Sequence, residues 1–265
     1  YYFATCVQNG CESVQSNKIK FQCVNTGSPI RQVNLHIKAL LEGPFNASTG
    51  LMNTALNQHG LLPGQTPTSP FGVATPTGQP YKNAPWNYNG SESVTTYPTT
   101  VVDWVLIQLI NAATGQSAFK TAALIHANGQ VTLVATNPLI DTTATYTIVM
   151  MHRNHISAVS HQAVAVTNAT INYDFTLQDS YINPQTPSVG QKKIGNLFFL
   201  YTGDIDKSSA TQKNDINFSD NAKLRTVNGK FEEYHNADIN LDADINFNDM
   251  NAFRKNSGVF STVQY

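Results

Sequence analysis

Charged side chains are scarce in this chain of 265 residues, and the two signs nearly balance. Lys, Arg, Asp and Glu together make up 12% of the sequence, and the formal net charge is -1. A chain without a basic excess has no general electrostatic attraction to nucleic acid or to an anionic membrane surface. The composition therefore predicts neither nucleic acid nor such a membrane as a partner.

Long apolar runs are also missing. No run approaches the roughly 20 residues that a helix needs to cross a bilayer. The sequence opens with YYFATC, without Met and without a basic segment followed by an apolar one, which is the pattern of a processed mature chain. Because 41% of the residues are hydrophobic, we still expect a folded core. We predict a secreted protein, extracellular or associated with the cell surface, with no transmembrane segment.

Cysteine is confined to one end of the sequence. All three cysteines lie in the first 23 residues, and residues 24–265 contain none. This clustering favours one local disulfide in an oxidising compartment, with the third thiol buried or paired between chains. A zinc site is the weaker alternative, because the spacing is unsuitable and no His is near. The sequence does not rank the three possible pairings among Cys6, Cys11 and Cys23.

Much of the chain has the apolar pattern of β-strands. In residues 32–41 apolar and polar side chains alternate, which predicts a half-buried strand. The segment ANGQ at residues 127–130 predicts a hairpin turn. Further strands are predicted at residues 18–24, 99–110, 119–125, 131–135, 145–151, 163–166 and 170–176. About eight strands at this spacing, without a long amphipathic helix, predict a mainly β fold of the antiparallel β-sandwich type.

A long segment between the strands, residues 43–98, is rich in Pro, Gly, Thr and Asn and has one short helical candidate at residues 50–60. Loops of this length pack on a sheet edge or carry a function. Its aromatic residues could form a platform for glycan contact or could pack the loop against the sheet, and we favour packing. These residues are Tyr81, Trp86 and Tyr88.

The scarce acidic residues gather near the C-terminus. Eight aspartates lie in residues 203–220 and 237–249. Carboxylates about 4 Å apart repel each other by roughly 4 kcal/mol at a surface-like dielectric, so they collect where water or a cation separates them. The alternatives are a solvated acidic surface and a metal site.

The second acidic stretch has the ligand spacing of an EF-hand or dockerin loop, in which oxygen ligands stand at positions 1, 3, 5, 7 and 12. Position 6 is Ala243, where such loops usually have Gly for its positive φ, and we expect reduced affinity from this exchange. The calcium ligands predicted by the spacing are Asp238, Asn240, Asp242, Asp244 through its carbonyl, and Asp249.

A helix is predicted to follow the second loop. The apolar position 8 is Ile245, and residues 247–253 continue as a helix that buries Phe247, Met250 and Phe253.

The first acidic stretch is a duplicate of the second with an insertion of five residues. DINFSDNAKLR at residues 215–225 aligns with DINFNDMNAFR at residues 244–254. A solvated acidic surface has no reason to repeat in register with apolar positions, so the pattern indicates a duplicated unit. We predict calcium as cofactor in the second loop and a further site in the first, whose occupancy the sequence leaves open. The candidate ligands in the first loop are Asp204, Asp206, Asp215 and Asp220.

Several phrases of the sequence are shared with a known group of proteins: LLEGPFNASTGLMNTALNQHGLLPGQTP, PYKNAPWNYNGSESV, VVDWVLIQLINAATG, MMHRNHISAVS, YDFT and YTGDID. Together they resemble the module found toward the C-terminal end of many large secreted proteins of Bacteroidetes-type bacteria. The resemblance spans residues 33–256 and implies a secreted, surface-associated, calcium-binding module without implying a reaction. The family module is normally a tail on much larger proteins, whereas only a short segment precedes it here.

Three histidines and one aspartate have alternative interpretations. On a strand, residues three apart face opposite sides, so His152 and His155 are not expected to share an ion. We interpret these two and His161 as residues of the core edge or of turns. Asp103 lies inside an apolar strand and could be a buried catalytic acid with a perturbed pKa. We favour an aspartate at a strand edge that accepts hydrogen bonds from loops.

Three segments are predicted along the chain. Residues 1–30 are a cysteine-containing strand segment, residues 31–180 a β-sandwich module, and residues 198–258 a small dockerin-like or EF-hand-like calcium domain. The strand at residues 18–24 is the candidate for pairing with a neighbouring subunit.

No catalytic signature is present in the sequence. The carboxylates before residue 200 are too thinly spread for the paired acids of a glycosidase, and we find no nucleophile elbow, phosphate loop or catalytic zinc motif. We therefore predict a non-enzymatic structural protein, stabilised by calcium, that self-associates into an extracellular filament or surface layer. The alternative is a dockerin-like or carbohydrate-binding module of a secreted polysaccharide-degrading system, with a protein or a surface glycan as its partner.

Overall fold

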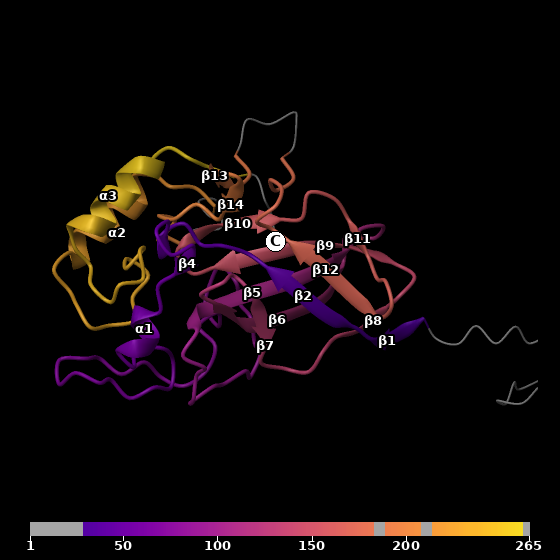
Figure 1. Cartoon of the computed structure of the whole chain (residues 1–265), viewed down its shortest axis with the longest axis horizontal. Coiled ribbons are helices and arrows are strands. Elements are labelled where there is room, and N and C mark those ends of the chain that lie inside the picture. Colours follow the sequence, from indigo (N-terminus) through magenta and orange to yellow (C-terminus); the bar gives the residue numbers. More distant parts are fainter. Residues whose placement is uncertain (1–28, 183–188, 208–213, 262–265) are drawn as a thin grey trace, which may run out of the picture.

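The computed structural model describes residues 29–182, 189–207 and 214–261. These residues form a mainly β fold with antiparallel sheets and few helices (Figure 1). Across the described ranges, no helix is long and apolar enough to cross a membrane. The strand predicted at residues 18–24 lies outside the described residues. So do the three disulfide candidates, Cys6, Cys11 and Cys23.

A six-stranded antiparallel sheet forms the centre of the molecule. Its order is β10-β9-β5-β6-β7, and β11 pairs with β9. The strands are β5 (Val101–Asn111), β6 (Ser117–His126), β7 (Val131–Leu133), β9 (Thr145–His152), β10 (His155–Val159) and β11 (Val164–Ala165). The predicted hairpin at residues 127–130 joins β6 to β7, and its Gly129 has a φ of 85°. Five of these strands, β5, β6, β7, β9 and β11, overlap segments predicted as strands, which confirms those positions, whereas β10 was not predicted.

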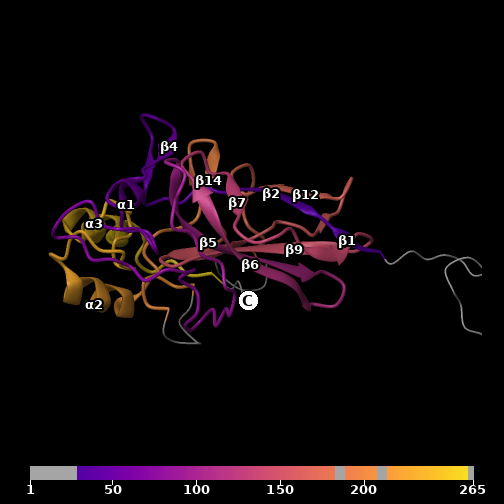
Figure 2. The ribbon, with the colours of Figure 1, turned by 90° about the horizontal axis from the view of Figure 1, so that it is seen from below.

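A second layer lies across one face of this sheet (Figure 2). It consists of β2 (Asn34–Lys38) and β12 (Thr170–Asp174). The alternation predicted for residues 32–41 is confirmed, since Val33, Leu35 and Ile37 are buried. The two strands pair in parallel, which is an exception in the described fold, because its other strand pairs are antiparallel as predicted. Parallel neighbours need a long connection, and here the whole central sheet lies between β2 and β12 in the sequence.

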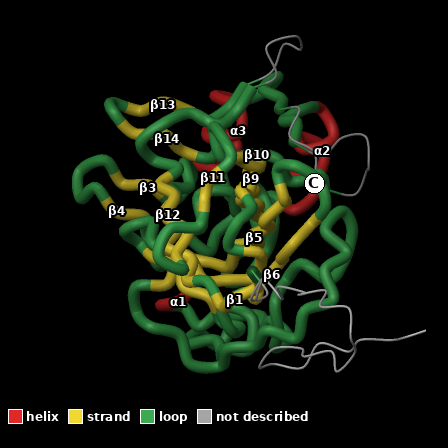
Figure 3. The backbone as a smooth tube through the Cα atoms, turned by 90° about the vertical axis from the view of Figure 1, so that its right-hand side faces the viewer, coloured by secondary structure: helices red, strands yellow, loops and turns green. Residues whose placement is uncertain are grey.

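The remaining elements are short. Three two-stranded ribbons pair β1 (Ile30–Gln32) with β8 (Leu139–Asp141), β3 (Phe45–Asn46) with β4 (Leu51–Met52), and β13 (Lys192–Ile194) with β14 (Leu197–Phe199). The helical candidate at residues 50–60 contains a single helical turn, α1 (Ala55–Gln58). Most of the helical structure is in α2 (Phe218–Val227) and α3 (Phe247–Asn256), which Figure 3 shows in red.

The long segment of residues 43–98 packs on the central sheet. The hydroxyl of Tyr97 accepts a hydrogen bond from Nε1 of Trp104 in β5 (2.9 Å), and the hydroxyl of Tyr81 donates to the Trp104 carbonyl (2.8 Å). Tyr81 is fully buried, Trp86 is 7% exposed, and their rings lie edge to face. Rings buried in this way have no free face for a sugar, so packing, and not the glycan platform, explains them. Tyr88 is half-buried.

The C-terminal unit lies at one end of the sandwich (Figure 1). Its helices are α2 (Phe218–Val227) and α3 (Phe247–Asn256). A small hydrophobic cluster contains apolar residues from both helices and Ile156 from β10. Leu241 and Ala243, from the loop before α3, belong instead to the large core of the sandwich. Each of the two predicted segments, residues 31–180 and 198–258, therefore contributes side chains to the hydrophobic cluster of the other.

Candidate metal centre

The second acidic loop directs its carboxylates inward. Asp238 accepts hydrogen bonds from the backbone amides of Asp242 (3.1 Å) and Ala243 (3.0 Å). At the other end of the loop, Asp249 accepts a hydrogen bond from the amide of Ile239 (2.9 Å). Ala243 has a φ of 76°, so the left-handed conformation expected at position 6 is present without a glycine.

The negative charge of this loop is only partly balanced by positive side chains in the described part of the chain. Among the residues that the structure describes, none forms an ion pair with its four aspartates. Burial raises the pKa of Asp238 well above its usual value, Arg153 offsets only part of this rise, and the neighbouring carboxylates add to it. Burial also raises the pKa of Asp249 to about 6. Carboxylates held together against their repulsion are suited to a cation.

Calcium itself stays a prediction. In the described part of the chain, no three His, Cys, Asp or Glu side chains are gathered closely enough to form a ready-made metal cluster. The candidate ligands of the second loop include an amide and a backbone carbonyl beside the carboxylates, as a calcium loop does. The side chain of Asn240 lies within the same loop, where its Oδ1 accepts from the amide of Asp242 (3.2 Å).

The first acidic loop repeats the hydrogen-bond pattern of the second. Asp220 accepts from the amide of Ile205 (2.6 Å), as Asp249 does from Ile239. Asp204 accepts from the amide of Asn214 (3.0 Å), whose φ is 63°. The structure thus brings Asp204 and Asp220 to one loop, as the spacing predicted.

Two further candidates of the first loop bind neighbours instead. Asp206 accepts from Nζ of Lys223 (2.6 Å), and Asp215 accepts from the side-chain amide of Asn217 (2.9 Å). The inserted residues 208–213 lie outside the described part.

Both loops lead directly into capped helices. Asn217 accepts from the amide of Ser219, and Asp220 accepts in return from the amide of Asn217. Asn246 and Asp249 form the same reciprocal capping box at the start of α3. Each box satisfies backbone donors that a helix start leaves free. The last aspartate of each loop therefore fixes both the loop and the helix.

The prediction that Phe247 is buried was wrong, because its side chain is 66% exposed. Successive residues of a helix are turned by about 100°, so Phe247 points away from the face that carries Asp249 and Phe253. Phe253 is buried as predicted, and Met250 is half-buried.

The turn between β9 and β10 connects this unit to the sheet. The chain reverses between His152 and His155, so their Nδ1 atoms lie 3.0 Å apart. We predicted that these rings face opposite sides of a strand, which was wrong because β9 ends at His152 and β10 begins at His155. Both rings are fully buried. Burial lowers the pKa of each, although Asp103 opposes this for His152.

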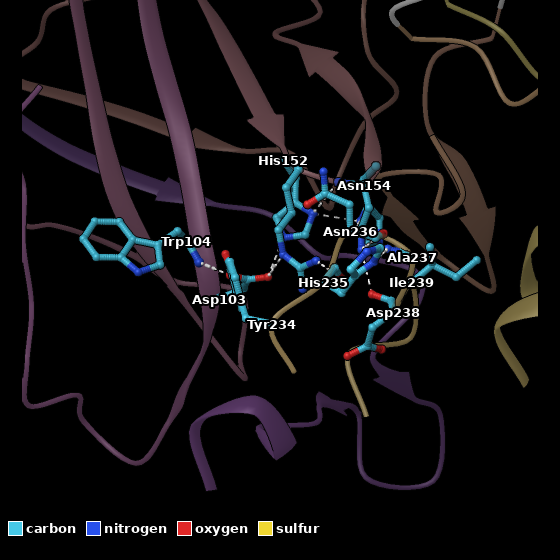
Figure 4. A network of polar contacts seen from close by, with 12 residues as sticks. Asp103, Trp104, His152, Asn154, Tyr234, His235, Asn236, Ala237, Asp238 and Ile239 are labelled. Carbon is cyan, nitrogen blue, oxygen red and sulfur yellow. Dashed lines mark hydrogen bonds and ion pairs between the residues drawn. The ribbon is translucent and has the colours of Figure 1, made fainter. Parts of the chain in front are cut away.

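Asp103 is saturated with hydrogen bonds (Figure 4). One carboxylate oxygen accepts from Nε of Arg153 (2.8 Å) and from Nε2 of His152 (3.2 Å). The other accepts from the hydroxyl of Tyr234 (2.6 Å) and the amide of Trp104 (2.7 Å). Burial opposes its ionisation, but Arg153 and the other donors outweigh this and lower its pKa. Asp103 therefore accepts a hydrogen bond from a loop residue, Tyr234, as we predicted, but its side chain is fully buried.

The same turn holds the backbone that leads into the second acidic loop. The side-chain amide of Asn154 donates to the carbonyls of Asn236 (3.0 Å) and Asp238 (2.7 Å), and Arg153 donates to the carbonyl of His235. Sequence reasoning missed Arg153 and Asn154. One signal could have predicted the contact between Arg153 and Asp103. Each of these two charged residues lies within or beside an apolar strand segment, where an unpaired charge is costly.

No family model matches the chain, and no curated protein matches it. Two solved structures that resemble it are type II cohesin-X-dockerin complexes from Acetivibrio cellulolyticus, one a C-terminal and one an N-terminal interface mutant. The first has a TM-score of 0.35 at 16% identity and covers 59% of this chain and 83% of that chain. For the second the TM-score is 0.36 at 17% identity, with 60% of this chain and 83% of that chain covered. A likeness at this level assigns neither a fold family nor a function.

Proposed function

We propose that this chain is a non-catalytic structural module of a secreted protein, in which calcium bound by the second acidic loop fixes the C-terminal unit on the β-sandwich. The observation that supports this most is the position of the loop. Leu241 and Ala243 pack in the core of the sandwich, and the carbonyl of Asp238 accepts a hydrogen bond from Asn154. An ion that closes this loop also stabilises its contact with the sheet.

Oxygen atoms of five residues would hold the ion: Asp238, Asn240, Asp242, Asp244 and Asp249. Calcium takes six to eight oxygens from flexible loops, and water would complete the set. The inward carboxylates lack any described ion-pair partner, which supports a cation as the missing charge.

A non-catalytic role is supported by the best candidate for a catalytic acid. Asp103 is fully buried, and both oxygens of its carboxylate accept hydrogen bonds from protein donors. A general base must reach a proton of the substrate, and this carboxylate has no open side.

Calorimetry of the full chain in chelator and in calcium tests the proposal. Metal that binds only the folded state stabilises it by RT ln(1 + [L]/Kd), about 2.7 kcal/mol at 100 times Kd. We expect calcium to raise the melting temperature. An identical melting curve in chelator, for protein shown to be free of metal, would refute the calcium role.

A second candidate function, docking of a protein partner, is favoured by two exposed rings. Phe218 and Phe247 are the first residues of α2 and α3 and are 82% and 66% exposed. Both copies of the duplicated unit thus expose a large apolar side chain at the same position, and exposed apolar side chains mark an interaction site where they form a patch. Sedimentation velocity of the full chain and of the Phe218→Ser/Phe247→Ser variant tests whether a second copy binds there. Leu139, 72% exposed on β8, provides the control variant Leu139→Ser.

Assembly into a filament or surface layer stays part of the proposal. The strand predicted to pair between subunits, residues 18–24, lies outside the described residues. The assembly proposal therefore rests on the sequence. Deletion of residues 1–24, followed by negative-stain microscopy, is the test. A folded monomer that no longer assembles supports strand donation between subunits, and a full-length protein that stays monomeric at high concentration with calcium contradicts it.

A further inference from the structure

The two acidic loops share a hydrogen-bond pattern but differ in the cations around them. In the first loop the side chain of Lys207 is 3% exposed. Its ammonium group contacts the carboxylate of Asp204 and donates to the carbonyl of His155 (3.0 Å). In the second loop, no lysine or arginine stands between Asp238 and Asp249.

Two more lysines distinguish the first repeat from the second. Nζ of Lys223 lies 2.6 Å from Asp206, and the residue equivalent to Lys223 in the other repeat is Ala252. The alignment that pairs Asp215 with Asp244 also places Lys213 where the second loop has the ligand candidate Asp242. The first repeat thus has a lysine where the second has an acid, and two other lysines that the second lacks.

The ammonium group of Lys207 takes the role that a bound cation would have in this loop. Asp204 is fully buried, and its Oδ1 has no hydrogen-bond partner among the described residues. A buried carboxylate without a compensating positive charge is strongly destabilising. The ammonium of Lys207 supplies that charge from within the chain and bonds to the backbone of β10 as well. A divalent ion in this loop would have to displace the ammonium or lie beside it, and two buried cations would repel each other.

We propose that the ammonium group of Lys207 is the resident cation of the first acidic loop, so that the chain binds one calcium ion, in the second loop. The calcium count rests on the proposed function, whereas the role of Lys207 does not. The duplicated unit then has one loop neutralised by its own lysine and one that needs an external ion.

Native mass spectrometry of the full chain, first stripped by chelator and then titrated with calcium, counts the ions. We expect one per chain, and none in the Asp249→Asn variant. Two ions in the unmodified chain, or one ion left in Asp249→Asn, would overturn the assignment of the first loop. No ion at all would overturn the proposed function, and the role of Lys207 would still be decided by its own variant.

That variant is Lys207→Met, measured in chelator so that calcium plays no part. Loss of one partner of a buried ion pair should lower the melting temperature by on the order of 10 °C. The control is Lys230→Met, whose pair with Glu233 is on the surface, and we expect a shift of at most about 2 °C. A shift for Lys207→Met as small as that of the control would overturn the proposal. If Lys207→Met does not fold, the double variant Asp204→Asn/Lys207→Met removes both charges. It should then fold and still bind one ion, and failure to do either contradicts the proposal.

Discussion

The two acidic loops are a natural comparison, because one unit of sequence has been copied and has then diverged. Both loops keep an aspartate that accepts backbone amides at the loop start and one that caps the following helix. Lys207 and Lys223 contact carboxylates of the first loop, whereas the second loop has no such partner in the described residues. If the second loop binds calcium as proposed, the difference teaches that one backbone arrangement can balance buried negative charge in two ways, with a side chain of the protein or with an ion from solution.

Both loops meet the sheet at the same place. The carbonyl of His155 accepts from Lys207 of the first loop, and the side chain of Asn154 donates to backbone carbonyls before and within the second. The β9–β10 turn therefore positions both loops at once. Changes in this turn should affect the molecule more than changes in either loop.

Arg153→Met gives the largest expected effect. It leaves the buried carboxylate of Asp103 without its main positive partner, which costs about 3–5 kcal/mol for a buried pair. Urea denaturation of the full chain in calcium measures the loss. The control is Lys38→Met, because Lys38 and Asp174 form a partly exposed pair for which less than about 1 kcal/mol is expected. Similar small losses for both variants would show that the turn does not anchor the loops.

A matched pair of variants separates calcium binding from helix capping. Asp249→Asn and Asp220→Asn change equivalent residues with the same amide partners, so in chelator both should lose similar stability. In calcium, only Asp249→Asn should also lose the stabilisation by the ion, about 2.7 kcal/mol at 100 times Kd. Calorimetry in both conditions measures the difference. An equal loss of the calcium effect in both variants would mean that both loops bind the ion.

Local patterns in the sequence were enough to find β2, β12, the strands of the central sheet other than β10, and the acidic loops. The apolar run at residues 99–110 and the alternation at residues 32–41 depend only on neighbouring residues, and so does the spacing of the aspartates. The close approach of Lys207 to Asp204 also follows a local spacing of three residues, and it could have been predicted.

Contacts between distant segments account for what the sequence did not reveal. The segment between His152 and His155 has neither Gly nor Pro to indicate a turn. The turn is fixed by Arg153 and Asn154, whose partners are 50 to 84 residues away in the sequence. The parallel pairing of β2 with β12 likewise joins residues separated by the whole central sheet. Such partners exist only once the chain is folded.

The histidine pair adds a pH dependence to the turn. His152 and His155 face Asp103, Arg153 and Lys207, and the pKa of each ring is lower in the folded chain than the usual 6.5, mainly through burial. The unfolded chain then binds protons first, so stability falls as the pH drops below about 6.5, by about 1.4 kcal/mol per unit for one ring that stays neutral. We expect a loss of about 2 kcal/mol at pH 5 from such a ring.

The comparison of wild type with His155→Asn isolates this contribution, because both proteins contain the same carboxylates. Urea denaturation at pH 7 and pH 5 should show a smaller loss for the variant. Equal losses would assign the pH dependence to other groups.

The smallest effect on stability is expected for two aromatic side chains that both repeats have on the surface. Phe218 and Phe247 begin α2 and α3 and remain exposed although the loops before them have diverged in charge. An exposed side chain contributes little to folding, so Phe218→Ser and Phe247→Ser should each change the free energy of unfolding by less than about 0.5 kcal/mol. If the rings form a docking surface, the double variant should lose association in sedimentation velocity while its melting temperature stays that of wild type, and Leu139→Ser should lose neither. A large loss of stability in either single variant would instead mean that these rings pack within the folded chain, and the docking surface would have to be given up.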